Sequence, residues 1–344
     1  MKKNYILATS ITLCLLTFIL LINHNTLKSD VIINKLQVEI PMPTLYYSDI
    51  SAKKILPYTI ENHKLTLSKE KMIPFTEGFL PKDKYNFYMA ILKTFAASRE
   101  ISLPKYFHDF YEDEKFVVIS FSGDLKDVYI IEKNNLRMHL LNYATPLNLG
   151  PMYVSHIQVV DNYLIILAGE AESYNALIYT IYLPTFSVVD AVRLATHPTA
   201  IKDTHYTITT TGQCVFINGS GLKVYDPLNA TYKLINLDFT PTRVMSYQDS
   251  VIALGESTDA FKYAVLDSHY KISTTGELTP PAPNSTIVDT LTYEDNLYII
   301  SYDTHYSRYP NYLSIYNLRN SELLYALGIS SNKPYALLEG SLTQ

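Results

Sequence analysis

The chain has 344 residues, of which 47% are apolar and 18% are charged, so it can bury a large core and is not disordered. Thirty tyrosines without any tryptophan favour β-structure, because tyrosine suits half-buried strand positions. Only three of the 28 basic residues and none of the 33 acidic residues lie in the first 28 positions, so the remainder has a net charge of −8. An acidic domain of this kind argues against nucleic-acid binding.

An uncharged run extends from Tyr5 to Ile22, directly after Lys2 and Lys3. As a helix this run would span about 27 Å, close to the roughly 30 Å hydrocarbon thickness of a bilayer. The preceding lysines predict that the N-terminus stays in the cytoplasm and that the rest of the chain is translocated. No small-residue cleavage pattern follows the run, so we expect a single-pass anchor in the cell membrane. The alternative is a cleaved signal peptide and a secreted protein.

The sequence therefore divides into three parts. Residues 1–22 are interpreted as a cytoplasmic tip and transmembrane signal-anchor, residues 23–40 as a linker, and residues 41–344 as one extracytoplasmic domain. Cys214 is the only cysteine of that domain, so its stability must come from its core and not from a disulfide. A composition rich in Lys, Asn, Ile and Tyr, without disulfides, favours a bacterial source.

One segment of the domain has helical spacing. Within Pro81–Ser98, Tyr85, Met89 and Leu92 recur at intervals of three and four residues. We expect an amphipathic helix at about 81–98, inserted between β-rich units. It either packs on the rim of the domain or docks a partner.

A short turn recurs along the rest of the domain. Its positions are Asp113, Asp161, Thr211, Asp249 and Asp295, which are spaced by 48, 50, 38 and 46 residues. The Asp, Asn and Gly residues of these turns tolerate the backbone conformations of tight hairpins. Each turn is followed by an apolar strand and then by two further strands. With the strand before the turn, each unit has four antiparallel strands, as in a propeller blade.

The two ends of the domain complement each other. Residues 43–48, 55–61 and 64–70 resemble the last three strands of a unit that lacks its first strand. Residues 335–342 resemble a first strand with no turn after it. Pairing of these N- and C-terminal strands would close a ring and remove its free sheet edges.

This pattern resembles the β-propeller superfamily, in the broad WD40/YVTN-like sense, over about residues 41–344. The resemblance implies an all-β fold, a six-bladed propeller, with seven blades as the alternative if residues 72–110 hide another blade. It is one of architecture only. No subfamily motif is present, so no functional residue is implied by it.

Histidines occur near the ends of three predicted first strands. His108 and His156 stand five residues before their turn positions, and His205 stands six before. Neutral imidazoles bind zinc, so these three are the candidate ligands of a metal on the propeller axis. The neighbouring units place Arg243 and Val244 there, which do not assist a metal. No cofactor is therefore predicted, and the metal site remains an alternative.

The most distinctive polar segment is the loop 302–312. Tyrosine and arginine are enriched in binding hot spots, and tyrosines also stack on sugars. The candidate binding residues are Tyr302, His305, Tyr306, Arg308, Tyr309 and Tyr312. Local packing of these rings under a long loop is the competing interpretation.

No catalytic or phosphate-binding motif is present, so we expect a protein that is not an enzyme. The leading hypothesis is a membrane-anchored, extracytoplasmic propeller that binds a protein or another envelope component. The alternatives are a propeller hydrolase or lyase with an axial metal, and a glycan-binding module.

Overall fold

The computed structural model describes residues 26–27, 29–36, 40–49, 54–68, 72–74, 82–103, 107–121, 127–142, 152–170, 176–194, 205–305, 309–337 and 342–343. The predicted transmembrane segment 5–22 lies outside these residues. Within the ranges just given, no helix is long and apolar enough to cross a membrane.

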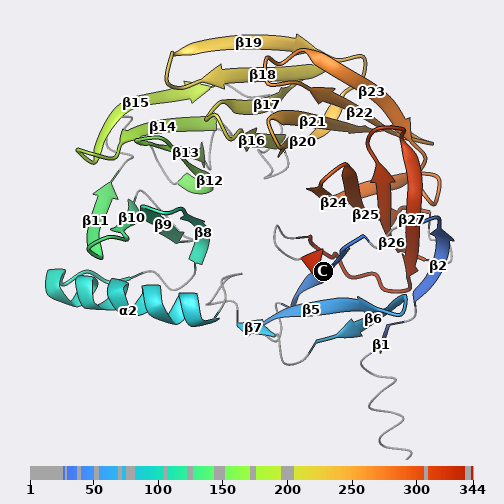
Figure 1. Cartoon of the computed structure of the whole chain (residues 1–344), viewed down its shortest axis with the longest axis horizontal. Coiled ribbons are helices and arrows are strands. Elements are labelled where there is room, and N and C mark those ends of the chain that lie inside the picture. The colour runs from blue at the N-terminus through green and yellow to red at the C-terminus, as the bar shows by residue number, and fades with distance from the viewer. Residues whose placement is uncertain are drawn as a thin grey trace, which may run out of the picture. The chain divides into compact units, whose positions relative to one another are not determined.

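The described chain is almost entirely antiparallel β-structure, with six sheets of four or five strands and one short two-stranded sheet (Figure 1). In four of these sheets each strand pairs with its neighbour in sequence, as the repeat predicts. Their strands are β8 (Phe107–Glu112), β9 (Phe116–Phe121), β10 (Asp127–Glu132) and β11 (Arg137–Asn142); β12 (Met152–Val160), β13 (Tyr163–Glu170), β14 (Ala176–Tyr182) and β15 (Ser187–Leu194); β16 (Tyr206–Ile208), β17 (Cys214–Asn218), β18 (Gly221–Asp226) and β19 (Thr231–Asn236); and β20 (Pro241–Tyr247), β21 (Ser250–Glu256), β22 (Phe261–Leu266) and β23 (Ile272–Leu278).

Contacts divide the chain into two compact units, one of residues 74–256 and 262–276 and the other of residues 1–73, 257–261 and 277–344. In the first unit, consecutive sheets pack face to face. On β13, Leu164 and Ile166 contact the β8–β11 sheet. Ile165 and Leu167, which alternate with them, contact the β16–β19 sheet. Both faces of the strand are therefore buried, and its sequence is a continuous apolar run rather than an alternating one.

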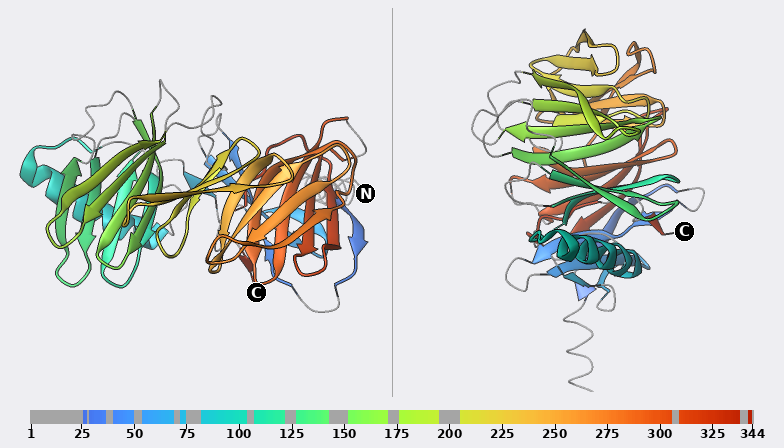
Figure 2. Two further views of the ribbon diagram at one scale, coloured as in Figure 1. Left: turned by 90° about the horizontal axis from the view of Figure 1, so that it is seen from above. Right: turned by 90° about the vertical axis from the view of Figure 1, so that its left-hand side faces the viewer.

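A helix covers the remaining face of the β8–β11 sheet. The helix α2 (Lys82–Arg99) confirms the helix predicted at 81–98. Its Tyr88, Met89 and Leu92 are buried against β9 and β10. In the neighbouring sheets of this unit a second sheet occupies the corresponding face, so α2 stands where a sheet would otherwise pack (Figure 2). The described part of residues 72–110 therefore contains a helix and no additional four-stranded sheet.

The second unit holds the two five-stranded sheets. The strand order of one is β2-β27-β26-β25-β24, with β2 (Ser29–Asn34), β24 (Ser285–Tyr293), β25 (Asn296–Asp303), β26 (Asn311–Asn317) and β27 (Glu322–Ile329). The order of the other is β1-β6-β5-β4, with β7 also paired to β5; its strands are β1 (Thr26–Leu27), β4 (Leu45–Asp49), β5 (Lys54–Glu61), β6 (Lys64–Leu67) and β7 (Ile73–Pro74). One apolar core joins the two sheets.

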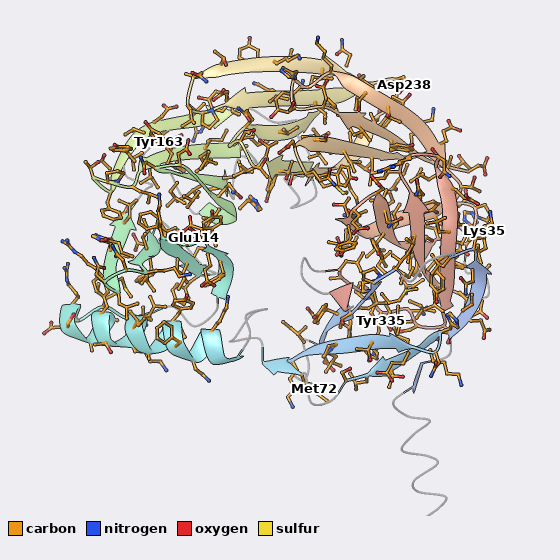
Figure 3. The ribbon with its side chains drawn as sticks, in the orientation of Figure 1. Lys35, Met72, Glu114, Tyr163, Asp238 and Tyr335 are labelled. Atoms are coloured by element: carbon orange, nitrogen blue, oxygen red, sulfur yellow. The ribbon has the colours of Figure 1, made fainter. Side chains whose placement is uncertain are left out.

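The C-terminal segment contacts β4 of this unit. Tyr46 of β4 and Ala336 form an antiparallel bridge in which each amide donates to the other's carbonyl, at 3.0 and 2.8 Å. Tyr335 is buried beside the ring of Tyr58 (Figure 3). Beyond the bridge, β28 (Leu342–Thr343) pairs with β3 (Met42–Pro43). The C-terminal segment thus pairs with N-terminal strands, as the incomplete terminal repeats predict.

The range 23–40, expected to be a linker, contains two strands. β1 pairs with the outer strand β6, and β2 pairs with the outer strand β27. Val31 of β2 also packs against the core of this unit. The N-terminal segment therefore adds a strand to each of two sheets. The sequence did not predict these two strands, because both are short and their partners lie elsewhere in the chain.

Candidate functional site

The loop predicted as a binding site is built around a buried aspartate. The carboxylate of Asp303 accepts a hydrogen bond from the His305 amide at 2.8 Å, and the Asp303 amide donates to the Pro310 carbonyl at 2.8 Å. The Thr304 hydroxyl donates to the Asn284 carbonyl at 2.9 Å. These bonds tie the two ends of the loop together and to the segment before β24, as expected for an Asx-type turn.

Two of the candidate tyrosines are buried under this loop. Tyr309 is 6% exposed and Tyr312 is 4% exposed, and their rings meet edge to face with centroids 6.2 Å apart. The Tyr309 hydroxyl donates to the carboxylate of Asp30 on β2. A Cβ placed on Gly328 would clash with the Tyr309 ring, so glycine makes room for this packing.

The remaining candidates of the loop differ in exposure. Tyr302 is half-buried, and His305 is exposed. Tyr306 and Arg308 lie outside the described residues. A ligand surface on this loop stays a prediction, and the described part of the loop offers it His305 and part of Tyr302.

The histidine candidates do not share one register. In β8, His108 is an extra residue at a β-bulge, because Phe107 pairs with Phe121 while Asp109 pairs with Ser120. In β12, the residue after the corresponding bulge is His156, which pairs with Leu167. The equivalent of His156 in β8 is therefore Asp109 and not His108. His108 and His156 are equally far from their turn positions in sequence but not equivalent in the sheets, because the β8–β9 turn is longer than the two-residue β12–β13 turn.

The pairing register places a polar residue at this position in several sheets. The fifth residue of the second strand pairs with Asp109, His156, Arg243 and Asp289 in four sheets, always directly after a bulge. Continuing the β16–β17 pairing by one residue puts His205 opposite Ile217, the fourth residue of β17, so His205 is one residue out of this register. Within the first unit, β8 and β12 are neighbours in space, so the positions of Asp109 and His156 lie on adjoining strands.

Among these residues, Asp289 has a structural role. Asp289 accepts hydrogen bonds from its neighbour Thr290 at 2.8 Å and from the Leu337 amide of the C-terminal segment at 2.6 Å. The carboxylate thus joins its own strand to the next one. Among the described side chains, no group of three His, Cys, Asp or Glu residues could hold a metal ion, and the His108 side chain is not among them. The metal site therefore remains a hypothesis without geometric support.

A different surface is exposed and apolar. Tyr232 and Leu234 lie on the same side of β19 and are 68% and 57% exposed. The ammonium group of Lys223 lies 5.1 Å from the centroid of the Tyr232 ring. On the opposite side of β19, Lys233 donates to the His269 and Tyr270 carbonyls and Ile235 is buried in the core. Only one side of the strand is thus available to a partner.

β19 is also the edge of its sheet, and nothing described covers that edge. β6 and β27 are covered by β1 and β2, β15 has a bulge at Val189, and β23 presents mainly Ser, Thr, Gly and Glu. The pairing of β19 with β18 is regular over six residues. Of the outer strands in the described chain, β19 alone carries two exposed large apolar side chains. Natural sheets normally protect such an edge.

The sequence offered a weak signal for this surface. Tyr232, Leu234, Ile235 and Leu237 make both sides of the strand apolar, whereas an outer strand with one solvated side should alternate. Composition cannot decide which of two apolar sides is covered, because that depends on the neighbouring sheet.

Repeated four-stranded antiparallel sheets packed face to face are the architecture of β-propeller proteins, so the architecture recognised in the sequence is confirmed. No family model matches the chain, and no curated protein matches it in sequence.

Several solved propeller structures resemble the chain. Hsv2 from Kluyveromyces lactis is 12% identical with a TM-score of 0.43, and the match covers 65% of this chain and 64% of Hsv2. Hydrazine synthase from Kuenenia stuttgartiensis is 10% identical with a TM-score of 0.41, and the match covers 60% of each chain. The extracellular domain of BT4673 from B. thetaiotaomicron is 10% identical with a TM-score of 0.46, covering 91% of this chain and 40% of that one. The chain thus spans less than two thirds of the length of each of these structures. We infer nothing about function from likenesses of this size, and the fold assignment rests on the sheets.

Proposed function

We propose that the protein is a membrane-anchored binding module, without enzymatic activity, that holds a protein of the membrane or envelope on the outer side of the membrane. The anchor is the apolar run 5–22, with Lys2 and Lys3 on its cytoplasmic side. The binding surface is the outer edge of β19 with the exposed side chains of Tyr232 and Leu234.

The observation that carries this proposal is the uncovered apolar edge of β19. An extended segment can add a strand to such an edge, with backbone hydrogen bonds giving affinity and alternate side chains giving specificity. The chain itself contains an example, since β2 adds a strand to the outer strand β27. The occupant we propose is therefore an extended segment of the partner protein, about six residues long, with apolar residues at alternate positions.

We further propose that the sheets form a closed six-bladed ring. In this arrangement residues 335–337 supply the missing first strand of the β4–β6 sheet. The antiparallel bridge between Tyr46 and Ala336 supports this assignment. The described helix in the range 72–110 supports six blades over seven.

Site-specific photocrosslinking in native membranes tests the binding surface. A photoreactive residue is placed at each position from 231 to 236, with Thr274 on the outer strand β23 as the matched control. We expect one partner to be captured from positions 232 and 234. No partner should be captured from positions 233, 235 and 274. Tyr232→Asp should abolish capture from 234. Capture that is equal at all positions, or absent from 232 and 234, would exclude this surface.

A further inference from the structure

The N-terminal segment is bound firmly to the domain from Thr26 onward. Thr26 and Leu27 pair with Thr66 and Leu65 of β6. Two residues later, Ser29 begins β2, which pairs with β27 along its whole length (Figure 1). The chain therefore pairs with one sheet up to Leu27 and with the other from Ser29 onward.

Side chains fasten the same segment. The Ser29 hydroxyl donates to the His63 carbonyl at 3.2 Å and accepts from the Leu65 amide at 3.1 Å. At the other end of β2, the Lys35 amide donates to the Leu324 carbonyl at 2.7 Å, and its ammonium group lies 3.0 Å from the Glu322 carboxylate (Figure 3). Residues 26–27 and 29–36 are thus part of the folded domain and not a flexible tether.

The distance from the predicted anchor to this paired segment is short. The apolar run ends at Ile22, four residue steps before Thr26. Four fully extended residues reach at most about 14 Å. The headgroup region on one side of a bilayer is itself roughly 5–8 Å thick. A chain anchored through 5–22 therefore cannot carry the β1–β6 edge far from the membrane surface.

We propose that the edge formed by β1 and β6, with the β5–β6 turn, lies against the phospholipid headgroups and fixes the orientation of the domain on the bilayer. Residues 61–64 of this turn are exposed and comprise an acid, an amide, an imidazole and an amine, which suits contact with headgroups rather than with hydrocarbon. The inference rests on the proposed membrane anchor and adds the surface that faces the lipid.

Headgroup quenching in liposomes tests this placement. The full-length chain carries Cys14→Ser, and its remaining cysteine, Cys214, is fully buried. A fluorophore is attached at Lys64→Cys, or at the control Asn134→Cys, which is exposed in the equivalent turn of the β8–β11 sheet. In phosphatidylcholine liposomes with a spin label on one lipid headgroup in ten, we expect at least twofold stronger quenching at 64 than at 134.

A variant with a spacer between the anchor and β1 tests whether the short connection is what holds position 64 near the headgroups. Twenty Gly and Ser residues inserted after Asn25 should make quenching at 64 fall to the value at 134, with unchanged Tm. Equal quenching at both sites without the spacer, or no effect of the spacer, overturns the placement. Retention in the liposomes after an alkaline wash is measured first. Loss at that step overturns the anchor itself, whereas retention with equal quenching overturns only the lipid-facing edge.

Discussion

At the scale of single residues, Glu112 shows how one carboxylate attaches α2 to its sheet. Lys84 of α2 lies 2.7 Å from this carboxylate, Lys133 of the β10–β11 turn lies 3.0 Å from it, and the Tyr88 hydroxyl donates to it at 2.9 Å. Burial alone raises the pKa of Glu112, but the hydrogen bonds from Lys84, Lys133 and Tyr88 outweigh it and lower the pKa to about 2.

A carboxylate with this pKa makes stability depend on pH in acid. Its folded pKa lies below the ordinary value of 4.5, so its contribution is complete above that pH and is lost as the pH falls towards 2. We expect Glu112→Gln to lower the free energy of unfolding by about 1–3 kcal/mol at pH 7. The difference from the wild type should shrink between pH 4.5 and 2, as measured by urea unfolding.

The matched control is Glu114→Gln, since Glu114 is exposed at the β8–β9 turn (Figure 3). Its effect should stay within about 0.5 kcal/mol at every pH. A Glu112→Gln deficit that is the same at pH 7 and pH 2.5 would contradict the assigned role of the charge.

The tyrosines show why residue type alone did not locate a site. Tyr298 and Tyr316 are fully buried, and their hydroxyls donate to the Pro41 and Thr279 carbonyls, each at 3.0 Å. Burial raises the pKa of both phenols. A tyrosine can thus fill a core and satisfy its hydroxyl at the periphery, so a tyrosine-rich loop such as 302–312 does not by itself indicate binding.

At the scale of elements, the turn before each outer strand repeats one backbone feature. A residue at the end of this turn, or one before the end in the case of Tyr270, has a positive φ in five sheets, namely in Leu136, Phe186, Ala230, Tyr270 and Ser321. None of these is a glycine, so each turn holds a side chain in a left-handed conformation that is costly for L-residues. The repeat was visible in sequence through strand spacing, while this conformation was not, because no glycine marks it.

Relieving this strain at one turn should stabilise the protein. Ala230 has a φ of 51° and is exposed, so Ala230→Gly removes only a methyl group that contacts solvent. We expect the free energy of unfolding to rise by up to about 1 kcal/mol, measured by urea denaturation. Ala260, in the β21–β22 connection, has no positive φ, so Ala260→Gly should lower stability by a few tenths to about 1 kcal/mol. A loss of stability in both variants would show that the turn is not strained.

Strand prediction succeeded where a turn and an apolar run bound each element. The strand predicted at 116–121 has those limits in β9, since Val117, Val118 and Ile119 are buried on both faces and a turn precedes them. β2 was missed for the opposite reason. Its burial pattern alternates, but its only partner is β27, almost 300 residues later, and no local turn reveals the pairing.

At the scale of the whole molecule, the pairing of the chain ends was predictable and the proposed binding surface was not. The incomplete first unit predicted that the C-terminal segment would pair near residue 46, because an unpaired strand edge is unfavourable. Whether the apolar side of β19 is exposed depends on how far the neighbouring sheet extends over it, which is a property of tertiary packing. The sequence of 231–236 is equally compatible with a covered strand.

The terminal pairing has a consequence for stability that a single backbone group can test. Ala336→Pro removes the amide that donates to the Tyr46 carbonyl and leaves that carbonyl without its partner. We expect a loss of about 2–4 kcal/mol in the free energy of unfolding. Limited proteolysis should then cut both near β4 and near the C-terminus, because each end holds the other. Ala336→Ser keeps the amide and should change stability by less than about 1 kcal/mol. If Ala336→Pro exposes only the C-terminal segment while β4 stays protected, the two ends are stable independently of this pairing.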